Sequence, residues 1–210
     1  MKITKPASPY FFEDKPLFGL DIGGYTLRVI QLDLIPKIPR LKGYGAIEFD
    51  PSAIVDGVIV KPKLIAKAAV NLFKKELVGD ISTKRVAVSL PSKWALTHAM
   101  RLPKMSLSDV AEAVQTEIDQ YIPTINGDNF YMDYTTLRED GDNIEVFVVA
   151  MPKPIVDSYL RLTRMLGLEA VLFDTTIGAN AHLFAHREQT DIPSVLVDFG
   201  SKNTDLTVFN

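Results

Sequence analysis

Apolar residues recur along the chain with two spacings, one typical of buried strands and one typical of amphipathic helices. Short apolar or alternating runs predict strands at 17–22, 26–34, 42–49, 85–90, 94–102, 130–137, 144–150, 169–173, 195–198 and 205–209. Apolar positions three or four residues apart predict helices over 62–77, 106–123, 154–166 and from Asp174 or Thr175 to about 186. Strand hairpins interleaved with helices indicate an α/β or α+β class.

Two glycine turns, far apart in the sequence, repeat one pattern. Residues 20–27 and 197–206 each run from an apolar strand into Asp-x-Gly, place a threonine shortly afterwards and return to apolar alternation. Glycine lets the backbone approach a ligand closely, and successive N–H groups can converge on a phosphate oxygen. The aspartates suit a hydrated Mg²⁺, which keeps several waters and takes one or two carboxylates. We therefore expect the two turns to face each other and clamp a triphosphate.

The paired turns resemble the two phosphate motifs of the actin, heat-shock chaperone and sugar-kinase superfamily. The stretch between them narrows the resemblance to the PilM family, actin-like cytoplasmic proteins of type IV pilus assembly in the branch that also holds the division protein FtsA. The narrower resemblance covers about residues 17–210. It rests on Leu-Pro-Lys-Met-Ser at 102–106, a helix ending Tyr121-Ile122-Pro123, Met-Asp-Tyr at 132–134, the apolar run 146–150 and Gly-Leu at 167–168.

The resemblance implies an α/β, actin-like (ribonuclease H-like) first lobe with an inserted small α+β subdomain and only the start of the second lobe. The expected divisions are an N-terminal extension (1–16), subdomain 1A (17–91 and 168–192), the inserted subdomain 1C (92–167) and the start of subdomain 2A (193–210). Family members continue through the rest of the second lobe, which supplies most of the adenosine pocket. The chain is therefore expected to be a fragment, a truncated product or a protein that has lost nucleotide binding.

The resemblance also assigns a site for ATP or ADP with Mg²⁺. The residues expected to contact the nucleotide are Asp21, Gly23, Gly24, Tyr25, Thr26 and Arg28 in the first turn, and Asp198, Gly200, Ser201, Asn203 and Thr204 in the second. Asp21 and Asp198 are the candidate Mg²⁺ residues, acting through water. Arg28 stands where the family usually has lysine and keeps the positive charge with a planar donor geometry. Tyr25 is bulky where a small residue is usual.

Asp174 is the candidate catalytic residue. It opens the last predicted helix, where the superfamily often keeps an acidic or amide group for water or a metal ion. The family commonly has a glutamate two residues later, and this chain has Thr176 there. No nucleophile or general base stands out, so we expect at most a slow ATPase.

Composition removes several functional classes. The chain has 210 residues, 23 basic and 26 acidic, and a net charge of -3, which argues against a dedicated nucleic-acid binder. No cysteine is present, which excludes disulfides, thiolate metal sites and a cysteine nucleophile. His182 and His186 lie four residues apart without an HExxH motif or a third ligand, so solvated or capping histidines are favoured over a metal site.

Two further observations favour a cytoplasmic protein. The longest apolar run, 146–151, is far shorter than the ~20 residues that a spanning helix needs. Prolines at positions 6 and 9 stand where a signal peptide needs its apolar stretch.

The resemblance implies an ATP-binding scaffold at the cytoplasmic face of a type IV pilus or a related secretion or competence machine. Such a scaffold, peripheral to the inner membrane, docks the N-terminal cytoplasmic tail of a PilN-type inner-membrane protein in a groove beside the inserted subdomain. Self-association is a further possible contact. Trp94 is either a core residue or an anchor for that partner. The alternatives are an FtsA-like cell-division adaptor and a superfamily ATPase or kinase.

The predicted helix 62–77 carries Lys63, Lys67, Lys74 and Lys75. A solvated face is favoured over a partner-binding face for this helix.

Overall fold

The computed structural model describes residues 15–33, 39–121, 129–187, 194–200 and 204–209. Several sequence predictions fall elsewhere and lie outside the described residues. They are most of the N-terminal extension, the Ile122-Pro123 helix end, the 191–193 linker, and the second-turn residues Ser201 and Asn203.

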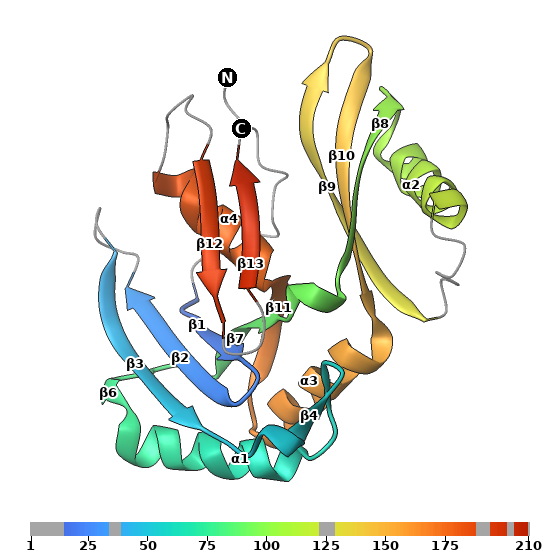
Figure 1. The fold of residues 1–210 in the computed structure, drawn as a ribbon. Coiled ribbons are helices and arrows are strands. Elements are labelled where there is room, and N and C mark those ends of the chain that lie inside the picture. The colour runs from blue at the N-terminus through green and yellow to red at the C-terminus, as the bar shows by residue number, and fades with distance from the viewer. Residues whose placement is uncertain (1–14, 34–38, 122–128, 188–193, 201–203, 210) are drawn as a thin grey trace.

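A six-stranded sheet forms the centre of the molecule, in the order β11-β7-β1-β2-β3-β6 (Figure 1). β1 (Phe18–Ile22), β2 (Thr26–Asp33) and β3 (Arg40–Glu48) are antiparallel, and β6 (Val78–Gly79) pairs with the edge of β3. β7 (Arg85–Leu90) and β11 (Glu169–Thr175) run parallel to β1. Three antiparallel strands followed by two parallel ones is the ribonuclease H-like order, so the expected fold class is confirmed.

Two helices bury one face of this sheet. Alternate residues of β1, Phe18, Leu20 and Ile22, point into the core, as the period of two requires. α1 (Pro62–Asn71) adds Ile65, Ala68 and Ala69 and continues into a wider π-helical turn at Leu72–Glu76. α3 (Lys153–Met165) adds Ile155, Tyr159 and Leu162 to the same cluster. Each fully buried Leu or Ile contributes about 1.5–3 kcal/mol through removal of its surface from water.

A second sheet projects away from the first (Figure 1). It contains β8 (Leu96–Pro103), β10 (Asn143–Pro152) and β9 (Phe130–Asp140), in the order β8-β10-β9. α2 (Leu107–Tyr121) covers one face, and the two elements enclose a separate core that includes Leu102, Val114 and Val146. Ser106 caps the start of α2, because its hydroxyl accepts from the Asp109 N–H at 3.3 Å.

The structure differs from the predictions at two short connections, and at a third it decides between the two predicted starts of the last helix. A two-strand hairpin, β4 (Ile54–Val55) and β5 (Val58–Ile59), is too short to show alternation and was not predicted. Ser92–Trp94 forms a 3₁₀ turn, so the predicted strand 94–102 begins only at Leu96. α4 (Thr176–Arg187) is capped by Thr175, whose hydroxyl accepts from the Gly178 N–H at 2.9 Å; Asp174 remains in β11.

β12 (Ser194–Phe199) and β13 (Thr204–Phe209) form a separate hairpin beside α4 (Figure 1). Both strands were predicted from the alternation of their residues. Among the described residues, no helix is both long and apolar enough to cross a membrane.

The buried Ser158 hydroxyl joins α3 to β5. It accepts from the Ile59 N–H at 3.0 Å and donates to the Ile155 carbonyl at 2.7 Å. Ser158→Ala removes the only described acceptor for a buried N–H, so we expect a loss of about 1–3 kcal/mol in unfolding free energy. Urea unfolding measures it. Thr116→Ala, which removes an exposed hydroxyl bonded to the Glu112 carbonyl, is the control and should change stability far less. Equal losses in the two variants would contradict the assignment.

Candidate functional site

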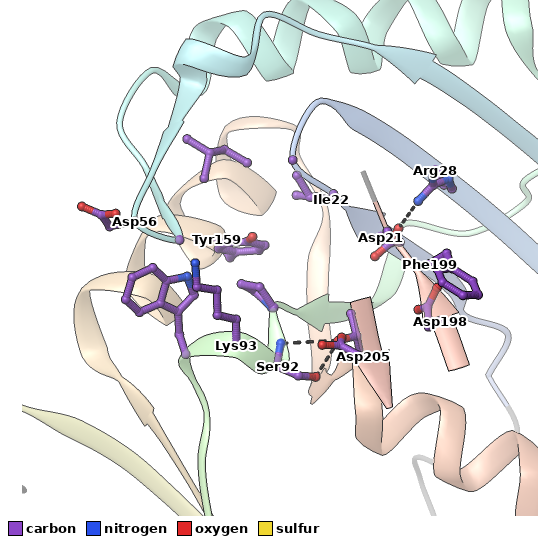
Figure 2. Close-up of a pocket in the computed structure, with 18 residues that line it drawn as sticks. Asp21, Ile22, Arg28, Asp56, Ser92, Lys93, Tyr159, Asp198, Phe199 and Asp205 are labelled. Carbon is purple, nitrogen blue, oxygen red and sulfur yellow. Dashed lines mark hydrogen bonds and ion pairs between the residues drawn. The ribbon is translucent and has the colours of Figure 1, made fainter. Parts of the chain in front are cut away.

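A cavity of about 470 Å³ lies where six parts of the chain meet (Figure 2). Its walls come from the β1–β2 turn, the β4–β5 turn, the 3₁₀ turn after β7, one side chain of α3, the first residue of α4 and the β12–β13 hairpin. The cavity is therefore built almost entirely from strand ends and turns, which is where α/β sheets place their ligands.

Both predicted glycine turns reach this cavity. The first contributes Asp21, Gly23, Gly24 and Arg28 to the lining. The second contributes Asp198 and Gly200. Asp21 and Asp198 are 177 positions apart in the sequence (198 minus 21) and share one cavity. Their convergence is the arrangement that the sequence pattern predicted for a phosphate clamp.

Three of the predicted contact residues do not line the cavity in the described structure: Tyr25, Thr26 and Thr204. Thr26 instead uses its backbone carbonyl to accept from the Gly23 N–H at 2.9 Å, which closes the first turn. None of the described glycines in the two turns has a positive φ. The close approach that glycine allows, rather than a left-handed backbone, is thus what these positions offer a ligand.

The first turn is held by a cross-strand ion pair. Asp21 and Arg28 are directly opposite in the β1–β2 register, and Arg28 Nη1 lies 2.9 Å from Asp21 Oδ2. The Ser89 hydroxyl donates to the other carboxylate oxygen at 2.6 Å. The Arg28 side chain is 59% exposed, so the pair contributes little stability, at most about 1 kcal/mol. Its main effect is to fix the direction of the Asp21 carboxylate.

The second turn places like charges opposite each other. Asp198 pairs with Asp205 in the β12–β13 register, and both line the cavity. Directly opposed like charges destabilise a hairpin. Their polar neighbours are distant: Asn180 Nδ2 lies 3.5 Å from Asp198, and Thr176 Oγ1 lies 3.5 Å from Asp205. Neither aspartate forms an ion pair with a described residue. The sequence prediction missed Asp205, although the hairpin register contained the signal.

The lining carries more negative than positive charge. Four aspartates, at 21, 56, 198 and 205, face two cations, Arg28 and Lys93, so the formal charge is 2 − 4 = −2. A polyphosphate would therefore need a divalent cation to enter. The described residues contain no group of three metal-binding side chains. Carboxylates in small number fit Mg²⁺, which keeps most of its waters and takes phosphate oxygens as further ligands.

The opposite side of the cavity is lined by Tyr159 and Trp94. Tyr159 is 1% exposed, and its hydroxyl has no hydrogen-bond partner among the described residues. Burial, and then the nearby Asp21 carboxylate, raise the pKa of Tyr159 well above its usual value. A hydroxyl that is open to the cavity and has no described acceptor fits an oxygen-rich ligand. The residues present are therefore compatible with a magnesium nucleotide.

Gly57 makes room for Trp94. It has a φ of +80°, and a Cβ atom there would lie 2.6 Å from the indole ring. Trp94 is half-buried and packs against the main core, as the core interpretation predicted, while also lining the cavity. Lys93 Nζ lies 5.4 Å from the indole centroid, a cation–π contact. Lys93 and Tyr159 were missed by the sequence analysis, and no local pattern marks them.

Asp174 does not line the cavity. One carboxylate oxygen accepts from the Thr175 N–H at 2.7 Å, and the other lies 3.8 Å from His182 Nε2. The His182 side chain is 82% exposed, in keeping with the solvated role expected for it. The catalytic role of Asp174 stays a prediction.

The sheet order, the inserted second sheet and the two turns at one cavity define an actin-like fold. The chain belongs to the type IV pilus assembly protein PilM family, whose family model matches residues 19–210. A solved structure described as a PilM-PilN type IV pilus biogenesis complex superposes with a TM-score of 0.79 at 24% identity. The match covers 91% of this chain and 57% of that chain, so this chain spans little more than half of it.

Two other solved structures match more loosely. A Bacteroides thetaiotaomicron protein with an actin-like ATPase fold and unknown function has a TM-score of 0.48 at 14% identity, covering 92% of this chain and 65% of that one. The cytoplasmic domain of EpsL, an inner-membrane component of the Vibrio cholerae type II secretion system, has a TM-score of 0.47 at 7% identity, covering 76% and 56%. A search of curated proteins gives no match.

The raised pKa of Tyr159 predicts how stability changes in alkali. The unfolded phenol ionises near its ordinary pKa of 10.0, whereas the folded protein retains the proton to higher pH. Stability is thus unaffected below about pH 10 and falls above it, by up to about 1.4 kcal/mol per pH unit. Urea unfolding from pH 8 to pH 11 should show a steeper decline in the wild-type chain than in Tyr159→Phe. Parallel declines would show that Tyr159 ionises normally.

Proposed function

We propose that this chain is a nucleotide-binding scaffold of type IV pilus assembly that docks the cytoplasmic tail of an inner-membrane partner. The observation that carries the proposal is the meeting of Asp21 and Asp198 in one cavity, in a chain that belongs to the PilM family. A scaffold needs a ligand site and a partner surface, and the chain offers a candidate for each.

The candidate ligand is ATP or ADP with Mg²⁺. Gly23, Gly24 and Gly200 line the cavity. Because the Gly23 N–H already donates to the Thr26 carbonyl, the backbone N–H groups of Gly24 and Gly200 are the proposed donors to phosphate oxygens. Asp21 and Asp198 would hold Mg²⁺ through its waters, and the ion would neutralise phosphate charge. Arg28 adds a cation, although its present bond to Asp21 leaves only part of its donor set for a phosphate.

The arrangement favours binding over turnover. Asp174, the one acidic group predicted to act on water, is engaged with the backbone and with His182 outside the lining. We therefore propose slow hydrolysis or none. The partner would then respond to whether ATP or ADP is bound, and not to the rate of hydrolysis.

The candidate partner surface lies on the three-stranded sheet. In the described residues, β8 and β9 are its two edge strands, and a free edge can accept an added strand. The complex formed by the solved relative supports a PilN-type partner. We propose that the tail binds beside the start of β8, where Leu96 is 38% exposed, and that this contact places the chain at the cytoplasmic face of the inner membrane.

The negative charge of the lining predicts that one substitution, Asp198→Asn, has opposite effects on ATP affinity with and without Mg²⁺. Asp198→Asn changes the formal charge from −2 to −1, so it should weaken MgATP binding about tenfold but strengthen binding of metal-free ATP. Isothermal titration with MgCl₂ or with EDTA measures both. Asp142→Asn, in the exposed β9–β10 turn, is the control and should change neither. Equal ATP affinity with and without Mg²⁺ in the wild type would contradict the proposed site.

Partner docking can be tested with a fluorescent peptide of the cytoplasmic N-terminal tail of the PilN-type protein from the same genome. We expect saturable binding by anisotropy, weakened at least about tenfold by Leu96→Glu, because a charge would enter an apolar contact. Val78→Glu is the matched control, since Val78 is equally apolar and 54% exposed on the β6 edge of the other sheet. Absence of binding by the folded wild-type chain would count decisively against the scaffold.

A further inference from the structure

Three side-chain hydrogen-bond donors lie at one end of the cavity. Lys93 Nζ, the indole N–H of Trp94 and the hydroxyl of Tyr159 belong to residues of the lining, and none of the three donates to an acceptor among the described residues. We call these three groups the donor end. Asp56 also lines the cavity, but Figure 2 shows its carboxylate directed away from Lys93 and Tyr159. Although Tyr159 is only 1% exposed as a residue, its hydroxyl is not sealed in the core, and it can bond to water or to a ligand oxygen in the cavity.

Lys93 and Trp94 of the donor end lie on one connection between the sheets, and Tyr159 lies in α3, which packs in the core of the large sheet. The 3₁₀ turn Ser92–Trp94 leads from β7 of the large sheet into β8 of the small one, and α3 follows β10 of the small sheet. The turn is anchored at one point, where the Ser92 hydroxyl lies 2.5 Å from the Thr176 hydroxyl and accepts from the Ile177 N–H at 2.8 Å. One chain crossing and the core of the large sheet therefore present donors to the same cavity.

We infer that the donor end receives the terminal phosphate of a nucleoside triphosphate, with Lys93 and Tyr159 donating to its oxygens. The inference rests on the nucleotide binding proposed above. The two glycine turns can serve the inner phosphates, and the same cavity continues from them to Tyr159. Lys93 has no carboxylate partner among the described residues, so its charge is available to an anion. Its cation–π contact with Trp94 is weak enough at an exposed site for a phosphate to replace.

With its third phosphate bound by Lys93 and Tyr159, ATP would bind differently from ADP. A diphosphate would leave Lys93 and Tyr159 without an acceptor, whereas a triphosphate would join them through one ligand. Because Lys93 lies on the connection into β8 and Tyr159 is fixed in the core of the large sheet, ATP would tie that connection to the large sheet and ADP would not. The edge strands proposed for partner docking would then be presented differently in the two nucleotide states.

The test compares the affinities of MgATP and MgADP in the whole chain. We expect Lys93→Met to raise the Kd of MgATP about tenfold or more, and Tyr159→Phe to raise it about fivefold, with the Kd of MgADP changed less than about twofold. Tyr159→Phe keeps the buried ring and removes only the hydroxyl. The matched control is Lys153→Met, which removes a lysine equally placed over a tyrosine ring, Tyr131 at 5.4 Å, outside the cavity.

Two readouts other than turnover are available. Trp94 is the only tryptophan of the chain, so its fluorescence reports ligand arrival at the donor end directly. Hydrogen exchange of the β8 amides reports restraint of the small sheet, and protection should be greater with MgATP than with MgADP. Adding inorganic phosphate to the MgADP complex distinguishes a free phosphate from the terminal phosphate of ATP. The inference requires the larger fluorescence change with MgATP.

The outcomes separate the inference from the proposed function. Equal losses of MgATP and MgADP affinity in both variants, or no change in either, would overturn the donor end while leaving nucleotide binding intact. Phosphate that binds there equally well without ADP would also overturn it. Failure of the folded wild-type chain to bind either nucleotide would remove both proposals, whereas binding of the partner peptide would still stand on its own measurement.

Discussion

Strand register decides the electrostatics of the cavity. In the first hairpin Asp21 is opposite Arg28, and the charges cancel across 2.9 Å. In the second hairpin the equivalent aspartate, Asp198, is opposite Asp205, and nothing described neutralises the two carboxylates. The repeated turn is therefore a repeat of backbone shape and not of charge. One side of the cavity is locally balanced, and the other carries the excess negative charge that calls for a cation from outside.

The local chemistry of the turns explains why the two hairpins could be predicted from the sequence. An apolar strand that ends in Asp-x-Gly can only form a hairpin if its residues alternate, and β1, β2, β12 and β13 do alternate. Five of the six strands of the large sheet and its core helices were predicted, because their apolar patterns are clear. The sixth strand, β6, has two residues and was not predicted.

The remaining features depend on tertiary contacts that no local pattern records. β4 and β5 have two residues each, so no period can be read from them. Trp94 ends a 3₁₀ turn because its ring needs the space above Gly57, which belongs to a different hairpin. Tyr159 looks like any apolar position of an amphipathic helix; only its place beneath the cavity gives its hydroxyl a role. Asp174 matched a family position in sequence, yet the Thr175 cap holds it in the strand.

The two sheets are built around two separate cores. Leu72, Val88 and Leu162 belong to one, Leu102, Val114 and Val146 belong to the other, and no buried residue is shared between them. Such a division means that the small sheet and α2 can turn as a rigid body without uncovering apolar surface in either core. Such a rotation would disturb the joints at Ala95 and Pro152 and the exposed contact between β9 and α3, where the Tyr131 hydroxyl donates to Asp157 at 3.0 Å. In mechanical terms, the stiffness between the two parts is set by these few exposed contacts and not by either core.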